Sequence, residues 1–363
     1  MFVEKLKTIK IIVHPLKIVP VVTFNKFFSY ICPLMSVTTM KNILLITSLT
    51  LVMTGGIIYD SAAQDAQFTQ FYANPLYLNP AFAGSERCPR VCVNFRDEWP
   101  AIPGNFVTYS ASIDRYVDAL AGGIGLLVEQ DKAGSGVVTT NNISAIYAYQ
   151  LNINRNFAIN AGFQATYHQK SIDQSKLNFG DMIDPVRGFV YSTSEQLTRT
   201  NVSSPDFSAG ILAYGRNVFF GASFDHLTQP DESFVQGASP LPLKYTAHAG
   251  AMIPVNNHST LSEDQFTISP NILFQKQGDF QQLDLGFYAI KGAVVGGFWY
   301  RNQDAVILLI GIDKKNIKFG YSYDVTISKL TLATGGSHEL SLVFQFQCRP
   351  KRHQYRVVNC PSF

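Results

Sequence analysis

Residues 157–168 read FAINAGFQATYH, with apolar side chains at the odd positions and mostly polar or small ones at the even positions. Alternation of period two is typical of a β-strand with one apolar face and one polar face. The same alternation recurs in residues 107–114, 317–324 and 339–347. A chain with many such runs is expected to form a sheet with one apolar face and one polar face.

Fourteen strands are expected from this pattern. They lie near 90–97, 106–114, 121–130, 137–151, 157–173, 206–214, 217–227, 243–254, 265–277, 280–289, 292–301, 305–313, 316–324 and 338–347. Several exceed the roughly 9–11 residues that cross a bilayer as a tilted strand, whereas strands of soluble proteins are commonly about 5–6 residues long. The sequence therefore predicts an all-β, up-and-down antiparallel transmembrane β-barrel.

The lengths of the connections support this prediction. The three longest connections, 174–205, 228–242 and 325–337, all follow odd-numbered strands, and the short turns 152–156 and 215–216 follow even-numbered ones. Outer-membrane barrels place long loops outside the cell and short turns in the periplasm. The alternative, a large soluble β-sandwich, needs apolar residues between its two sheets, but here the second face carries Gln, Asn, Asp, Lys and Ser.

The composition excludes several classes of protein. Only 15% of the residues are charged, against roughly 25% in an average soluble protein, which argues against a coiled coil, a disordered tail or an ordinary cytosolic enzyme. The chain has 29 basic and 26 acidic residues, a balance unlike that of a dedicated nucleic-acid binder. No nucleic-acid partner is therefore expected.

The N-terminal part is expected to be removed before the protein functions. Residues 40–63 combine a basic start, the apolar run 43–58 and the small residues Ser61, Ala62 and Ala63, which is the pattern of a secretory signal peptide. We interpret residues 1–39 as a mis-assigned extension ahead of the true start. The expected organisation is then an N-terminal plug segment (64–88), an outer-membrane barrel (89–347) and a basic periplasmic tail (348–363).

The plug is expected because residues 64–88 precede the first strand and yet are rich in large apolar side chains. Burying each such side chain stabilises a fold by roughly 1.5–3 kcal/mol, so the segment is expected to fill the lumen. The residues expected to form the plug are Phe68, Phe71, Tyr72, Tyr77, Asn79, Pro80 and Phe82.

Five charged residues are expected to point into the lumen near the outer ends of their strands. These are Arg96, Asp225, Arg301, Asp324 and Glu339. Charges are tolerated there because the interior of such a barrel is polar and opposite charges can pair. Two interpretations remain open: a belt of salt bridges that holds the mouth of the barrel, or a contact with a partner or substrate.

The cysteines and the tail leave further alternatives open. Cys348 is expected to bridge either to Cys88, across the seam between the last and first strands, or to Cys360 within the tail, and we favour the seam. The tail carries four positive charges, at Arg349, Lys351, Arg352 and Arg356. They are expected either to dock an acidic partner or outer-membrane lipid headgroups, or only to be solvated.

No catalytic, cofactor or metal site is expected. The histidines lack the spacing of metal ligands, and Gly122–Gly125 lacks the third glycine and the following helix of a phosphate-binding loop. Those glycines are better interpreted as small residues where a strand packs closely. The protein is therefore not expected to be an enzyme.

Eight blocks of sequence, taken in order, carry a resemblance to a known family. They are 77–84 (YLNPAFAG), 94–100 (NFRDEWP), 108–114 (TYSASID), 122–125 (GGIG), 177–181 (LNFGD), 225–230 (DHLTQP), 321–324 (YSYD) and 336–341 (GSHELS). Together they resemble the PorP/SprF family of type IX secretion system membrane proteins, over nearly all of the chain after residue 63.

This resemblance implies an outer-membrane barrel of the type IX protein secretion machinery, with a possible role in gliding motility. It implies an adaptor or anchor between a periplasmic ring, made of a lipoprotein and partner subunits, and exported surface proteins such as an adhesin with a C-terminal sorting domain. Residues 79–81 also resemble a segment of fatty-acid transporter barrels. The alternative function is therefore a passive outer-membrane channel for small apolar solutes.

Overall fold

The computed structural model describes residues 64–348 except 155, 185, 195–196, 236, 256–265, 315 and 328–334. The long strands are β1 (Arg90–Glu98), β2 (Phe106–Val117), β3 (Gly122–Ala133), β4 (Val138–Asn154), β5 (Phe157–Ile172), β8 (Asn201–Gly215), β9 (Val218–Asp225), β10 (Lys244–Ala251), β12 (Phe266–Gln277), β13 (Phe280–Lys291), β14 (Val294–Arg301), β15 (Ala305–Lys314), β16 (Ile317–Thr326) and β17 (Ser337–Gln345). These fourteen strands confirm the number and order expected from the alternation.

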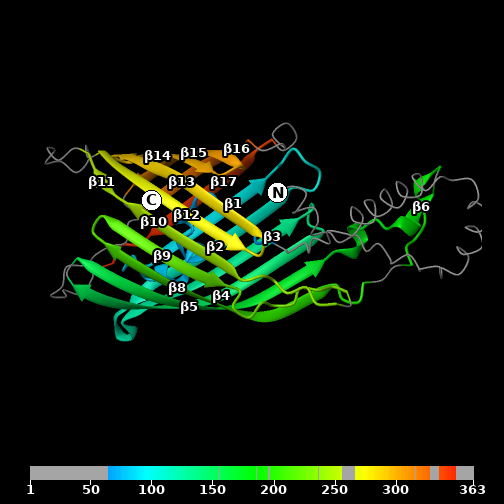
Figure 1. The fold of residues 1–363 in the computed structure, drawn as a ribbon, viewed down its shortest axis with the longest axis horizontal. Helices are drawn as coiled ribbons and strands as arrows, with labels where there is room; N and C mark the ends of the chain where they lie inside the picture. The colour runs from blue at the N-terminus through cyan, green and yellow to red at the C-terminus, as the bar shows by residue number, and fades with distance from the viewer. Residues whose placement is uncertain are drawn as a thin grey trace, which may run out of the picture. The chain divides into compact units, whose positions relative to one another are not determined.

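The strands form one closed antiparallel barrel (Figure 1). Each long strand pairs with the next one along the chain, and β10 pairs with β12. The barrel closes between its last and first strands, from Arg90 opposite Gln345 to Glu98 opposite Ser337. Closure leaves no free sheet edge between these strands, and it confirms the predicted up-and-down barrel.

The two faces of the barrel wall differ in the way that the sequence predicts. In β2, Tyr109 and Ile113 point outward and are 45% and 48% exposed, whereas Ser110 and Ser112 point inward and are 2% and 5% exposed. A soluble protein would show the opposite arrangement. An apolar outer face and a polar inner face are the arrangement of a barrel that is surrounded by lipid.

Strand β8 begins at Asn201, five residues before the expected start at residue 206. Pro205 lies just before the expected start and has no N–H group to donate to a neighbouring strand. The structure accommodates this proline because β9 pairs only with residues Ala209–Tyr214 of β8. Pro205 therefore lies where β8 has a strand neighbour on one side only, the β5 side.

Several short elements complete the described fold. The connection 174–205 contains a small hairpin of β6 (Ile183–Asp184) and β7 (Gly188–Phe189), and β11 (Ile253–Pro254) pairs with β12. The remaining helical turns in the connections are η4 (Asp118–Leu120), η5 (Gln174–Lys176) and η6 (Gly180–Met182). Within the described part of the chain, no helix has the length and apolar character needed to cross a membrane.

Three short helical turns precede β1: η2 (Phe71–Ala73), α3 (Pro75–Leu78) and η3 (Pro80–Phe82). A proline begins both α3 and η3, at a position where the missing N–H group has no helical partner to lose. Asn79 separates these two turns, and its side chain accepts a hydrogen bond from the backbone N–H of Ala81. The main apolar cluster joins residues 71–83 to inward-facing side chains of the wall, including Trp299.

Candidate functional site: the barrel interior

Four of the five expected inward charges lie together. Arg96 places Nη2 2.8 Å from Oδ2 of Asp324 and Nη1 3.2 Å from Oε2 of Glu339, and Arg301 places Nη1 3.5 Å from the same Asp324 oxygen. All four are buried, and we call them the belt network. The fifth residue, Asp225, lies apart from them and lines a cavity described below.

The belt network also binds the segment that precedes β1. The Glu339 carboxylate accepts hydrogen bonds from the backbone N–H groups of Thr69 and Gln70, at 2.6 and 2.9 Å. The Thr69 hydroxyl donates to Asp324 at 2.8 Å. Hydrogen bonds to charged groups are the stronger ones in proteins, so the same carboxylates that pair the arginines also hold residues 69–70.

The seven residues expected to form a plug lie among inward-facing side chains. Phe71 packs edge-on against Trp299 of β14, and Tyr72 packs edge-on against Phe219 of β9, with ring centroids 5.3 and 5.4 Å apart. Phe82 stacks on His248 of β10. Those that are buried are Phe68, Phe71, Tyr72, Asn79, Pro80 and Phe82, while Tyr77 is half-buried.

Glycines in the wall allow the backbone of this segment to approach closely. A Cβ atom at Gly162 of β5 would lie 2.4 Å from the Ala81 nitrogen, and one at Gly123 of β3 would lie 2.1 Å from the Ala83 oxygen. A Cβ at Gly210 of β8 would lie 2.1 Å from Oδ1 of Asn79. No real side chain fits at such distances, so residues 79–83 sit in a groove that only glycine permits.

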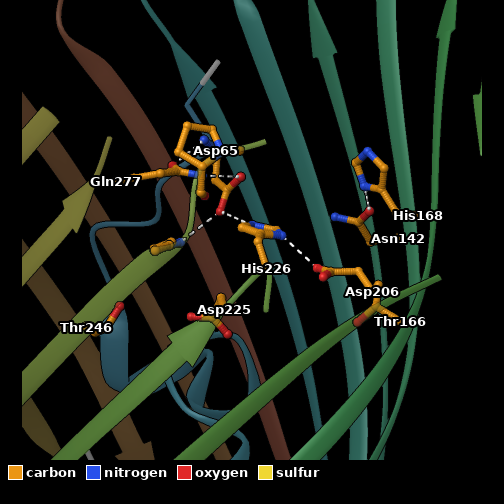
Figure 2. A network of polar contacts seen from close by, with 12 residues as sticks. Asp65, Asn142, Thr166, His168, Asp206, Asp225, His226, Thr246 and Gln277 are labelled. Atoms are coloured by element: carbon orange, nitrogen blue, oxygen red, sulfur yellow. Dashed lines mark hydrogen bonds and ion pairs between the residues drawn. The ribbon is translucent and has the colours of Figure 1, made fainter. Parts of the chain in front are cut away.

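A second polar network lies inside the barrel (Figure 2). His226 bridges two carboxylates, with Nε2 2.8 Å from Asp65 and Nδ1 2.7 Å from Asp206. Lys244 places Nζ 3.3 Å from Asp65 and 3.2 Å from the Tyr77 hydroxyl. This network therefore joins the start of the described segment to β8, to β10 and to the residue that follows β9.

The charge state of this network follows from its geometry. Burial opposes a charge on His226, but the neighbouring Asp65 and Asp206 carboxylates outweigh it and raise the pKa of His226 from 6.5 to about 10. Burial likewise opposes ionisation of Asp65, but His226 and Lys244 lower its pKa far below the usual range. Both groups are therefore charged at neutral pH.

Asp65, His226 and Lys244 were not expected as site residues. His226 belongs to the motif 225–230, and its position at the end of a predicted strand is the one signal that pointed to it. Nothing in the sequence pairs it with Asp65, 161 residues earlier. The barrel brings these residues together only through the position of the segment within it.

The cysteines lie at the seam of the barrel. Cys88 and Cys348 form a disulfide, with their Cα atoms 5.5 Å apart, and Cys92 is free and buried. Cys88 precedes β1 and Cys348 follows β17, so the bond joins the first and last strands at one end of the seam, beyond the Arg90–Gln345 pair. Cys360 and the basic residues Arg349, Lys351, Arg352 and Arg356 lie outside the described residues, as do residues 1–63.

The described residues contain no group of three or more His, Cys, Asp or Glu side chains placed to hold a metal ion. A closed antiparallel barrel with an apolar outer face and a polar inner face defines a protein of the bacterial outer membrane. Residues 60–344 match the family model for the type IX secretion system membrane protein PorP/SprF. The chain belongs to this family, and its partners are accordingly those of the type IX secretion system.

Solved barrels of other kinds match the chain at low sequence identity. A Pseudomonas aeruginosa FadL homologue is 12% identical, with a TM-score of 0.41, and the match covers 78% of this chain and 99% of that one. The Acinetobacter baumannii outer membrane protein Omp33 is 9% identical, with a TM-score of 0.39 and coverage of 72% and 99%. The KdgM porin is 11% identical, with a TM-score of 0.33 and coverage of 70% and 99%. The search of curated proteins returned no match.

Proposed function

We propose that this protein is an adaptor or anchor of the type IX secretion machinery rather than a diffusion channel. In this proposal residues 64–88 act as a fixed plug, and the barrel holds exported surface proteins near the periplasmic ring. The observation that supports it is the way residues 68–84 are bound: their aromatic side chains are buried, and their backbone lies against wall glycines. A channel for small apolar solutes needs a path through the space that these residues occupy.

The proposed partners follow from family membership and from the charges of the chain. They are the ring lipoprotein with its partner subunits on the periplasmic side, and a secreted adhesin with a C-terminal sorting domain on the outside. The basic tail, residues 348–363, is proposed to dock the ring or anionic lipid headgroups, because clustered Lys and Arg residues bind acidic surfaces. Residues 40–63 are proposed to act as the signal peptide.

Two measurements separate the adaptor from the channel. Deleting residues 64–84 while retaining Cys88 is expected to raise the conductance of the purified barrel in planar bilayers, because it empties the lumen. Deleting the whole gene is expected to remove one or a few surface proteins from the secretome. The matched control for both measurements is the full-length chain: the purified protein should show low conductance, and its expression in the deletion strain should restore the secretome.

The alternative predicts different results. Conductance in the full-length protein equal to that of the deletion, together with an unchanged secretome in the null strain, would support a passive channel. Unchanged conductance in a folded 64–84 deletion would contradict the plug, and an unchanged secretome alone would contradict the adaptor role.

A further inference from the structure

A cavity of about 860 Å³, including the space open to solvent, lies beside the second polar network. Its floor is formed by residues 64–66, and its walls come from the inner faces of strands β2 to β5 and β8 to β10. The connection 226–243 also contributes, through Glu232 and the buried Leu241.

The carboxylates of this cavity outnumber its cations. Six carboxylates line it, at Asp65, Glu129, Asp131, Asp206, Asp225 and Glu232, whereas its lining cations among the described residues are Lys170, Lys244 and the charged His226, which is paired with Asp65 and Asp206. Both lysines are already paired. Lys170 lies 2.7 Å from Glu232, and Lys244 lies 3.3 Å from Asp65.

Among the described residues, Glu129 is a lining carboxylate without a hydrogen bond or a close ion pair. It projects inward from β3 and lines the cavity, and within the described part of the chain its side chain makes no hydrogen bond or ion pair. Asp225 accepts a 3.4 Å hydrogen bond from Ser223 and likewise has no ion pair there. The Oε1 atom of Gln64, also in the lining, is buried without a hydrogen-bond donor.

Acceptors that lack a cationic partner and line a cavity favour a cationic occupant. Glu129 and Asp225 are half-buried. A carboxylate that is partly withdrawn from water without a cationic partner is destabilised, and a cation that donates hydrogen bonds removes part of that cost. Metal ions such as Ca²⁺ need several oxygen ligands converging at about 2.3–2.6 Å, and the described residues hold no such group. An ammonium or guanidinium group needs fewer acceptors and occupies more of the space.

We propose that this cavity is a binding site for an ammonium or guanidinium group, with Glu129 as its main partner and Asp225 and Gln64 as additional acceptors. The group belongs either to a free polyamine or to a Lys or Arg side chain of a polypeptide that reaches into the lumen. The inference does not depend on the proposed role in secretion, because the unpaired carboxylate and the cavity are present whatever the protein anchors.

The test is calorimetric titration of the purified full-length barrel in detergent with two probes, spermidine and acetyl-arginine amide. Binding of at least one probe is expected, and Glu129→Gln is expected to weaken it by about tenfold or more, because a charge-assisted hydrogen bond is lost. Asp279→Asn is the matched control, since it removes a carboxylate from an exposed turn, and it should leave binding unchanged. Binding of spermidine alone indicates a free polyamine, and binding of the arginine probe alone indicates a side chain.

Three outcomes would overturn the proposal: no binding of either probe to the unmodified protein, equal binding by Glu129→Gln, or binding of Ca²⁺ at the same site in preference to both probes. Folding of each variant is checked by its heat-modifiable mobility on gels. Should Glu129→Gln fail to fold, Asp225→Asn provides the second test, with a smaller loss of affinity expected and an unchanged affinity contradicting the site.

Discussion

The belt network and the cavity are both lined by charged side chains inside one barrel, yet their charges are used differently. In the belt network, Glu339 is engaged by Arg96 and by two backbone N–H groups of the segment before β1. In the cavity, Glu129 makes no hydrogen bond or ion pair with the described residues, and it lines the cavity. The comparison indicates that most of these charges hold the segment before β1 against the wall, at the belt network and at Asp65, whereas Glu129 takes no part in such a contact.

The largest expected effect is at the belt network. Arg96→Met removes a buried cation and leaves Glu339 and Asp324 facing each other without it. Breaking a buried ion pair in this way typically costs about 3–5 kcal/mol. Urea unfolding of the barrel in detergent should show a loss of that size, whereas Arg216→Met, at an exposed position, should change little. Equal losses of unfolding stability in the two variants would contradict a specific stabilising role of the Arg96 ion pairs.

A smaller effect is expected where the segment lies against the wall glycines. Gly162→Val introduces a Cβ only 2.4 Å from the Ala81 nitrogen, so the segment must shift. Overpacking of this kind costs about 1–3 kcal/mol and should expose residues 64–84 to added protease. The matched control is Gly296→Val in β14, because a Cβ there has nothing within 4 Å. If residues 64–84 are equally resistant to the protease in both variants, close packing of this segment against Gly162 is contradicted.

The smallest expected effect is at the cavity network, and it depends on pH. Because the folded pKa of His226 is raised to about 10, its contribution is fully present below pH 6.5, and it is lost as the pH rises toward 10. The unmodified barrel should therefore lose part of its stability over that window. His226→Gln should flatten this part of the profile while leaving the belt network intact. A profile that is unchanged in the variant would contradict a charged His226.

The alternation of side chains was sufficient to predict the wall of the barrel. Each strand must present apolar residues to lipid and polar residues to the lumen, so every strand carries its own signal. The exceptions have local causes. Pro205 interrupts the pattern of β8, and the hairpin β6–β7 lies in a connection that no membrane or lumen constrains.

The sequence by itself determined the fourteen strands, their order, their two faces and the family, because those properties follow from a period of two and from contiguous motifs. Only the tertiary structure decided which charges meet. Thr69 and Glu339 are 270 residues apart and touch because the barrel closes around the N-terminal segment. It also separated Asp225 from the other four inward charges and left Glu129 beside a cavity. Such contacts depend on the register of the whole barrel, which no local stretch of sequence encodes.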